Sequence, residues 1–325
     1  MQQRCNRLLF LVLPRGKPPI SSQGHTMNSR TRILATVAIT TLTSAMSGCP
    51  STPTGDLAVS LQAEDTIAEG LAAGSGDEQI TDGWAIEYTK FIVALGHVHV
   101  QQAGGAVNEV EMDLLADLRT VSSAGRPIQT LSGLPTGRYM FEYDTPIASA
   151  DFTRDASVTA ADQARMVAEG CTYLIQGTAT RETRSIAFDF CLAAETVLEC
   201  SAMAGAEGIV INSGSNSAAM TLHGDHLWFN GFPDGDEGVV LRRAGWLALA
   251  DDRTGADGLL TNADLAATPV TVLDPTLYSL TGAPSIDGMP IVNLLQYARA
   301  QVTTQGHLNG EGECLANGMG HDHGA

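Results

Sequence analysis

The chain has 325 residues, and its 36 acidic against 18 basic side chains give a net charge of −18 at neutral pH. The first 48 residues contain six basic residues and no acidic one, so the rest of the chain carries 12 basic and 36 acidic residues, a net charge of −24. A surface of this charge repels nucleic acid and anionic lipid headgroups. It excludes a nucleic-acid partner and favours a cation or a basic protein partner.

The N-terminus predicts export. Residues 1–26 place basic side chains around a short apolar run, and we interpret them as an upstream extension from a mis-called start codon; the alternative is an unusually long basic leader. Residues 27–48 form a signal peptide of their own. In it, Arg30 and Arg32 precede an uncharged apolar stretch that is too short for a permanent membrane span. Neither segment is expected in the mature protein.

The signal peptide ends in Met46-Ser-Gly-Cys49, which resembles the lipobox of bacterial lipoproteins, with Met where Leu is more common. The resemblance implies cleavage before Cys49, diacylglycerol on its thiol and acylation of the new amine, which together anchor a protein stably to a membrane. Pro50 follows in place of the Asp that is associated with inner-membrane retention. We therefore expect an exported protein that is lipid-anchored in the outer membrane.

The cysteines agree with export to an oxidising compartment. Four of them follow Cys49, and an even number in an exported domain predicts two disulfides with three possible connectivities. Cys191 and Cys200 flank a short segment and could pair locally, in which case Cys171 would pair with Cys314. The spacing Cys-x-x-Cys does not occur, so we do not expect a zinc site made of these four residues.

The chain order of the elements predicts a mainly β protein, an antiparallel β-sandwich with a small helical C-terminal appendage. Residues 49–81 are rich in small and acidic residues and are predicted to be a flexible tether. The sandwich is expected over residues 82–240, the appendage over 241–314 and a disordered tail over 315–325. Within the sandwich, alternating apolar residues predict strands at Trp84–Leu95, His97–Val100, Val110–Leu115 and Arg138–Tyr143.

Two hairpins and three helices complete the predicted elements. The hairpins join Thr172–Thr180 to Ser185–Cys191 and Ile209–Ile211 to Ala218–Leu222. A short helix is expected at Ala160–Ala168, with Thr159 as its cap and Gly170 as its stop. Apolar spacing predicts two more helices, at Leu241–Ala250 and Ile291–Gln301.

Histidines supply the first candidate site. His97 and His99 are two residues apart on a predicted strand, so both rings lie on one face, an arrangement that gives two nitrogens to one metal. In the sequence His223-Gly-Asp-His226, an extended chain puts His223 on the face of Asp225 and turns His226 away, unless Gly224 bends the chain. We predict a site for Zn²⁺ or Cu²⁺ in which the first pair meets His223 or His226. The candidate ligands are His97, His99, His223, Asp225, His226 and His307. The alternative is that these are ordinary polar residues of exposed strands.

The second candidate is an acidic segment, residues 250–265, which resembles the calcium loop of EF-hands and predicts a helix–loop–helix. Asp257-Gly258 matches the fifth and sixth loop positions, Thr261 the ninth and Asp264 the closing carboxylate. The segment departs from the pattern at its first ligand position, where Arg253 stands. Asp251 and Asp252 could substitute only if extra residues bulge out. The resemblance implies weak Ca²⁺ binding, and the alternative is a loop that has lost its calcium.

No nucleophile motif, phosphate loop, zinc-protease motif or dinucleotide fingerprint occurs in the sequence. Leu134-Pro-Thr-Gly-Arg-Tyr139, His223-Gly-Asp-His226 and Asp257-Gly258 together resemble uncharacterised lipoproteins of high-GC Gram-negative bacteria, a resemblance that implies no activity. The predicted function is a non-catalytic metal-binding or interaction module. The alternative is a zinc- or copper-dependent hydrolase or oxidoreductase, which convergence of His97, His99 and His223 beneath a cleft would favour.

Overall fold

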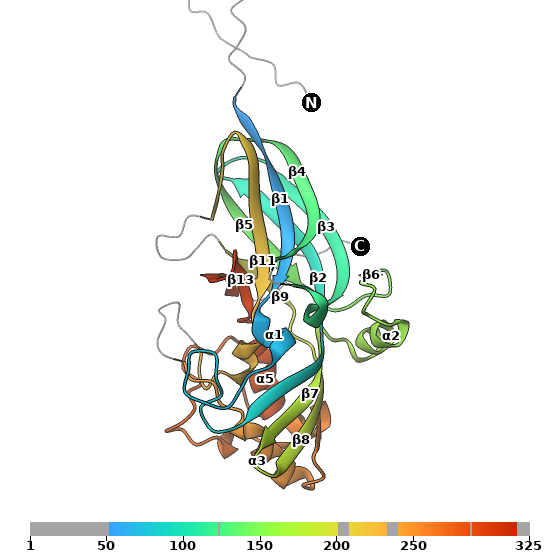
Figure 1. Cartoon of the computed structure of the whole chain (residues 1–325), viewed down its shortest axis with the longest axis vertical. Coiled ribbons are helices and arrows are strands. Elements are labelled where there is room, and N and C mark those ends of the chain that lie inside the picture. Colours follow the sequence, from blue (N-terminus) through green and yellow to red (C-terminus); the bar gives the residue numbers. More distant parts are fainter. Residues whose placement is uncertain (1–51, 123, 201–207, 233–239, 287, 317–325) are drawn as a thin grey trace, which may run out of the picture. The chain divides into compact units, whose positions relative to one another are not determined.

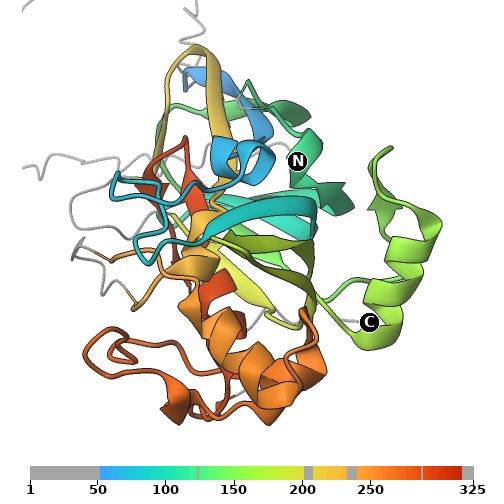
Figure 2. The same ribbon diagram turned by 60° about the horizontal axis from the view of Figure 1, so that its bottom comes forward.

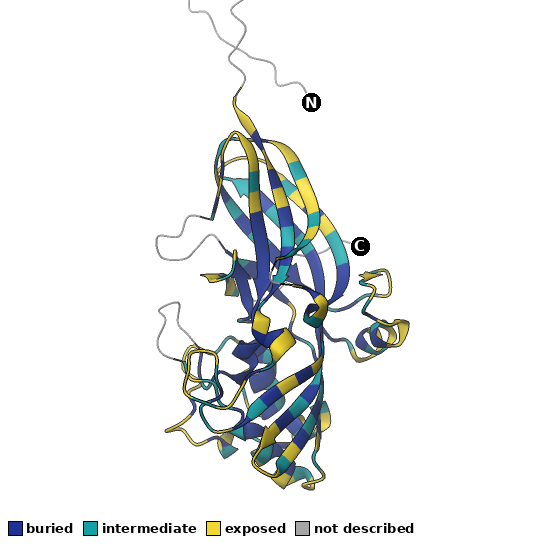
Figure 3. Ribbon diagram, in the orientation of Figure 1, coloured by how far each residue is buried: buried dark blue, intermediate teal, exposed yellow. Residues whose placement is uncertain are grey.

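The computed structural model describes residues 52–122, 124–200, 208–232, 240–286 and 288–316 (Figure 1). It is mainly β, as predicted, with 45% strand and 20% helix. Cys49 and the two N-terminal segments lie outside the described residues, as does most of the tail. Among the described residues, none of the helices has the length and apolar character that a membrane crossing needs. Figure 3 shows buried residues along the strands and within the helices of the last third.

One sheet has five strands in the described chain. Their spatial order is β14 (Gly312–Glu313), β13 (Gly306–Leu308), β11 (Gly214–Leu222), β1 (Thr54–Ala63), β4 (Arg126–Pro135). β1 runs parallel to β11 and antiparallel to β4. The predicted tether is therefore corrected: within residues 49–81, ten residues form an inner strand of this sheet, between β11 and β4. The reason is the alternation of Leu57, Val59, Leu61 and Ala63, which are all buried.

The second sheet is larger and is built around the 18-residue strand β2. Its main path is β12 (Leu259–Thr261), β8 (Arg184–Leu192), β7 (Tyr173–Arg181), β2 (Ala85–Gln102), β5 (Gly137–Thr145), β9 (Thr196–Glu199), β15 (Leu315–Ala316). Three further strands pair at its sides: β3 (Val107–Asp117) with β2, β10 (Ile209–Ile211) with β5, and β6 (Thr153–Arg154) with β3. β12–β8 and β3–β6 are parallel pairs.

The sheets are thus mixed, which corrects the expected antiparallel arrangement. Apolar side chains of both sheets belong to one buried cluster, and the Tyr143 hydroxyl of β5 lies 3.1 Å from the carbonyl oxygen of Thr221 and 3.3 Å from that of His307. The face-to-face packing of a sandwich stays a prediction.

The predicted hairpin between Ile209–Ile211 and Ala218–Leu222 is wrong. β10 pairs with β5, whereas β11 pairs with β1 and β13. The tight turn itself exists, because Asn216 accepts a hydrogen bond from the amide of Asn212 and donates one to its carbonyl. The two strands then enter different sheets. The other predicted hairpin, β7–β8, is confirmed.

The helices are short and gather mainly in the last third of the chain, where Figure 2 shows them close together. They are α1 (Asp65–Glu69), α2 (Ala160–Glu169), α3 (Gly245–Thr254), α4 (Asn262–Ala267) and α5 (Leu294–Val302), with 3-10 turns η1 (Leu118–Thr120), η2 (Asp225–Trp228) and η3 (Val270–Val272). The cap and stop of α2 are confirmed: Thr159 and Asp162 form a capping box, and Gly170 is left-handed at φ 63°. The helix predicted from Leu241 begins at Gly245 instead.

Two disulfides are present, as predicted, and they join Cys171 to Cys191 and Cys200 to Cys314. The local pairing of Cys191 with Cys200 is wrong. Strand pairing explains this. The β7–β8 hairpin brings the end of β8 back to the chain just before β7, and the β9–β15 pair brings Cys200 next to the C-terminal segment.

Candidate metal centre

Three segments that are far apart in sequence meet at one end of the five-stranded sheet. The parallel register aligns Ala63 of β1 with Leu222 of β11, and the amide of Glu64 continues it by donating to the carbonyl of Leu222 at 3.0 Å. Glu64 therefore lies beside His223. Sequence reasoning missed this glutamate because it fell in the predicted tether, although the apolar alternation that leads up to it was a usable signal.

The third segment is β13, which pairs antiparallel with β11 so that His307 lies opposite Thr221. The amide of His223 continues the ladder by donating to the carbonyl of Gln305 at 3.0 Å. His307 and His223 are thus held on neighbouring segments, and their rings stack with centroids 3.8 Å apart.

A bend after His223 adds two more side chains. Strand β11 ends at Leu222, and η2 begins at Asp225. A Cβ atom on Gly224 would lie 2.5 Å from Cγ1 of Ile67, so only glycine lets the chain pass this close to α1. The bend turns His226 toward His307 instead of away from the site. This is the alternative that the sequence left open at Gly224.

The result is a cluster of five side chains that we call the metal centre: Glu64, His223, Asp225, His226 and His307. Ligand atoms of the three histidines lie within 4.8 Å of one another, and the same holds for Glu64, His223 and Asp225. The three histidines and Asp225 are all buried, and Asp225 is fully so. The Nε2 atoms of His226 and His307 are 3.2 Å apart. Two Zn–N bonds at a tetrahedral angle would place their nitrogens roughly 3.3 Å apart.

Hydrogen bonds fix which nitrogen each of two histidines presents to the cluster. Nε2 of His223 is 3.0 Å from the carbonyl of Gly310, which can only accept, so this nitrogen carries a proton, and Nδ1 is the atom that a neutral ring would offer to a metal. Nδ1 of His226 is 3.0 Å from the hydroxyl of Thr304, which donates its own proton to the carbonyl of Gln301. Nδ1 of His226 is therefore the donor, and its Nε2 is the available ligand atom.

Both carboxylates are held in the same way, by one oxygen each. Oε2 of Glu64 accepts from the hydroxyl of Thr66 at 2.5 Å and from the amide of Gly224 at 3.1 Å, while Oε1 lies 3.6 Å from Nδ1 of His223. Oδ2 of Asp225 is paired with Arg242, whereas Oδ1 is buried and has no hydrogen-bond partner among the described residues. A buried carboxylate oxygen without a partner is costly, and a cation would satisfy it.

The electrostatics of the centre follow from burial. Burial and the charge of Asp225 raise the pKa of Glu64 to about 8. Burial and the neighbouring His223 lower the pKa of His226 well below its usual value, and the same causes lower the pKa of His307 to about 2. The imidazoles of His226 and His307 are therefore neutral at physiological pH, which is the form that binds metals.

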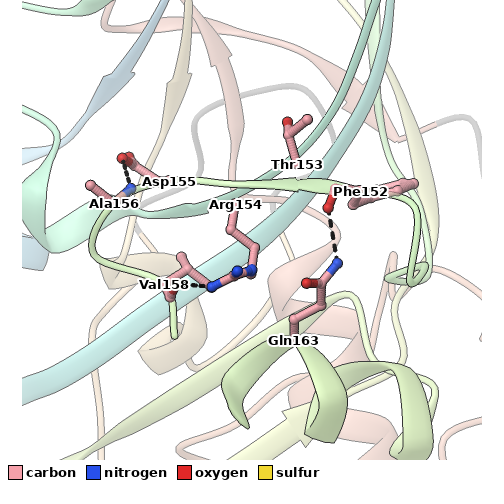
Figure 4. A pocket seen from close by; sticks show the side chains of 7 residues that line it. All are labelled: Phe152, Thr153, Arg154, Asp155, Ala156, Val158 and Gln163. Atoms are coloured by element: carbon pink, nitrogen blue, oxygen red, sulfur yellow. Dashed lines mark hydrogen bonds between the residues drawn. The ribbon is translucent and has the colours of Figure 1, made fainter. Parts of the chain in front are cut away.

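A pocket of about 290 Å³ opens next to the centre. Glu64 and His223 lie in its wall, together with acidic and polar residues: Gln62, Asp65, Glu78 and Glu311. The pocket therefore borders the cluster on the side of Glu64 and His223. A larger pocket of about 540 Å³ beside β6 and α2 differs in kind (Figure 4). There, Arg154 donates to the carbonyl of Val158 and Gln163 to that of Phe152, and the one carboxylate in its wall pairs with Arg126.

The remaining predicted ligands lie elsewhere. His97 and His99 are on β2, near Glu109 of β3, and neither belongs to the two ligand groups found among the described residues. The predicted meeting of this pair with His223 or His226 therefore does not occur in the described chain. Sequence spacing could not settle this, because it does not say which strands become neighbours.

The acidic loop, residues 250–265, has the order α3, β12, α4. Its carboxylates bond within the protein. Asp251 accepts from Arg184 at 2.7 Å and from the amide of Gly258 at 3.0 Å, and Asp252 pairs with Arg184 at 2.6 Å. Asp264 accepts from the hydroxyl and amide of Thr261 in a capping box that starts α4, and Asp257 accepts from the amide of Leu259. These carboxylates supply none of the three-residue ligand groups of the described chain.

Comparison with known proteins gives no match: no family model fits the chain, and none of the curated proteins or solved structures matches it.

Proposed function

We propose that this chain is an exported, lipid-anchored protein that binds one divalent transition-metal ion, Zn²⁺ or Cu²⁺, in the metal centre. The observation that carries the proposal is shared by four of the ligands: Glu64, His223, Asp225 and His226 each have one polar atom fixed by a neighbour and a second atom directed into the cluster. Such outer hydrogen bonds orient metal ligands and set their tautomers.

The composition of the centre supports the choice of metal. Imidazole nitrogens suit zinc and copper, and carboxylate oxygens complete the coordination without the thiolates that this chain uses in disulfides. With His226 and His307 neutral, a divalent ion would displace the proton that the raised pKa of Glu64 keeps on this carboxyl near neutral pH. The acidic wall of the adjacent pocket attracts cations to it.

The decisive experiment counts metal ions in the mature protein. After removal of metals by a chelator and reloading with Zn²⁺, we expect wild type to retain one ion more than the variants His226→Gln and Glu64→Gln. Glu69→Gln, an exposed glutamate on the neighbouring helix α1, is the matched control and should retain the wild-type number. Equal ion counts in wild type and all three variants would exclude the metal centre.

A metal-dependent hydrolase or oxidoreductase is the second candidate, and the pocket beside Glu64 and His223 is the observation that favours it, because a catalytic metal needs an open position. We rank the binding protein first, since His97 and His99 stand apart from the centre. The zinc-loaded protein assayed on ester and phosphoester substrates separates the two: hydrolysis that is lost in His226→Gln would favour the enzyme.

The lipid anchor on Cys49 is part of the proposal and rests on the lipobox resemblance. Mass spectrometry of the mature N-terminus tests it. We expect an acylated peptide that begins at Cys49. An unmodified Cys49, or a chain that keeps residues 27–48, would contradict the anchor and the outer-membrane location without affecting the metal centre.

A further inference from the structure

We propose that His97, His99 and Glu109 form a second site for a divalent transition-metal ion, separate from the metal centre. The two histidines alternate with Val98 on β2, so their rings project from the same face of the sheet, nearly parallel at 16° with centroids 6.2 Å apart. The antiparallel register with β3 places Glu109 directly opposite His99.

The carboxylate of Glu109 lies between the two rings. Its Oε1 atom is 3.8 Å from Nε2 of His97 and 3.4 Å from Nε2 of His99. Two nitrogens and one oxygen therefore face a common volume. The ligand atoms of these three side chains do not all lie within 4.8 Å of one another, so metal–ligand bonds of about 2.0–2.2 Å require both rings and the carboxylate to move inward. The side chain of Glu109 can move because it is 47% exposed, and imidazole rings rotate in broad torsional wells.

A buried carboxylate stands behind His97. Oδ2 of Asp144 is 3.9 Å from Nδ1 of His97, and Oδ1 of Asp144 accepts a hydrogen bond from the amide of His97. A Cβ atom on Gly96 would lie 2.3 Å from Oδ1 of Asp144, so the glycine is what allows this close approach. At 3.9 Å this carboxylate is too far from the ring for a hydrogen bond. If the ring moved closer on metal binding, the carboxylate could orient it in the way that is usual for a histidine ligand.

The site is accessible. The rings of both histidines are partly exposed, and the side chain of Glu109 is about half exposed. Two imidazoles and one carboxylate leave room for water to complete the coordination, and they match zinc or copper better than calcium or magnesium. Because the site is more exposed than the metal centre and has fewer protein ligands, we expect it to bind its ion less tightly.

The test uses the full mature chain loaded with Zn²⁺, with ions counted by mass spectrometry and affinities measured by calorimetry. His97→Gln/His99→Gln should lose one ion and keep the ion of the metal centre. Glu109→Gln should weaken this second ion about tenfold or more. Glu111→Gln is the matched control, since this glutamate lies opposite His97 in the same register, and it should bind like wild type.

The second site is independent of the proposed function, so their failures are distinguishable. In His226→Gln, which disrupts the metal centre, added Zn²⁺ should still shift the imidazole NMR signals of His97 and His99. The proposal is overturned if the double variant keeps the wild-type ion count, or if Glu109→Gln and Glu111→Gln bind zinc alike.

Discussion

The metal centre and the acidic loop use acidic side chains in opposite ways. In the metal centre, Asp225 has one oxygen paired with Arg242, and its other oxygen is buried with no partner in the described part of the chain. In the acidic loop, Asp251 has one oxygen paired with Arg184 and the other bonded to the amide of Gly258. The first carboxylate keeps one oxygen that the described protein does not satisfy, whereas both oxygens of the second are bonded within the protein. Residue type and spacing alone do not distinguish these two states.

The largest difference in stability should come from replacing the arginine that pairs with each of these two aspartates. Arg242→Met leaves Asp225 charged, fully buried and unpaired, so we expect a loss of about 3–5 kcal/mol in the free energy of unfolding. Arg184→Met leaves the buried Asp251 with the amide of Gly258 as a remaining partner, and Arg184 itself is more than one-third exposed, so we expect a smaller loss, about 1–3 kcal/mol. Urea unfolding of both metal-free variants measures the difference. Equal losses would mean that the two aspartates do not differ in the way described.

Loss of the long-range disulfide should affect the metal centre, because this bond lies close to His307. The Cys200–Cys314 bond closes a loop of 114 residues, and the amide of Cys314 donates to the carbonyl of Gly306 next to His307. We expect Cys200→Ser/Cys314→Ser to lower the free energy of unfolding by about 2–5 kcal/mol and to weaken zinc binding at the metal centre. Calorimetry before and after substitution checks this. Unchanged zinc affinity would show that β13 holds His307 without the disulfide.

The pH dependence of the stability of the metal-free protein should give a smaller effect, and its direction can be predicted. Folding raises the pKa of the Glu64 carboxyl, so the free energy of unfolding should fall as pH rises from about 4.5 to about 8. Folding lowers the pKa of His226 and His307, so these two groups should increase the free energy of unfolding as pH rises to their unfolded pKa of 6.5. Together they should place maximal stability near pH 6.5.

Above that pH, stability should fall by up to about 1.4 kcal/mol per unit until pH 8. Glu64→Gln should remove the fall, and denaturant titrations in the presence of a chelator compare the two proteins. An identical slope in both would show that Glu64 is already ionised at pH 6.5 in the folded protein.

Calcium should give the smallest effect. Because Arg184 and backbone amides occupy the loop carboxylates, we expect Ca²⁺ to stabilise wild type by less than about 1 kcal/mol beyond Mg²⁺ at matched ionic strength. Arg184→Met frees Asp251 and Asp252 and should enlarge the calcium-specific part, and adding Asp257→Ala should abolish it. A large calcium-specific rise in the melting temperature of wild type would instead favour the EF-hand resemblance.

Local patterns predicted local structure well. Alternation located β2, β5, β7 and β8, and the capping residues located α2 nearly to the residue. The sequence did not indicate which distant strands pair with each other. The same alternation in Leu57–Ala63 was hidden by a surrounding composition that is typical of a tether.

The same limit applies to the candidate site: its residues could be named from the sequence, but not which of them come together. Sequence reasoning named His223, Asp225, His226 and His307, but it joined them to His97 and His99, because both groups sit on strands and nothing in the spacing says which strands become neighbours. Glu64 and Arg242 enter only through tertiary contacts.

The parallel pairing of β1 with β11 has a consequence for when the metal can be acquired. Glu64 and the amide of Gly224 that holds it are separated by 160 residues, and His307 comes from nearly the end of the described chain. Loop closure over such distances comes late, after local hairpins and helices have formed. An ion bound by all three segments cannot be held by a nascent or partly folded chain. It must be drawn from the compartment in which folding finishes, so occupancy of the centre would record the metal supply of that compartment.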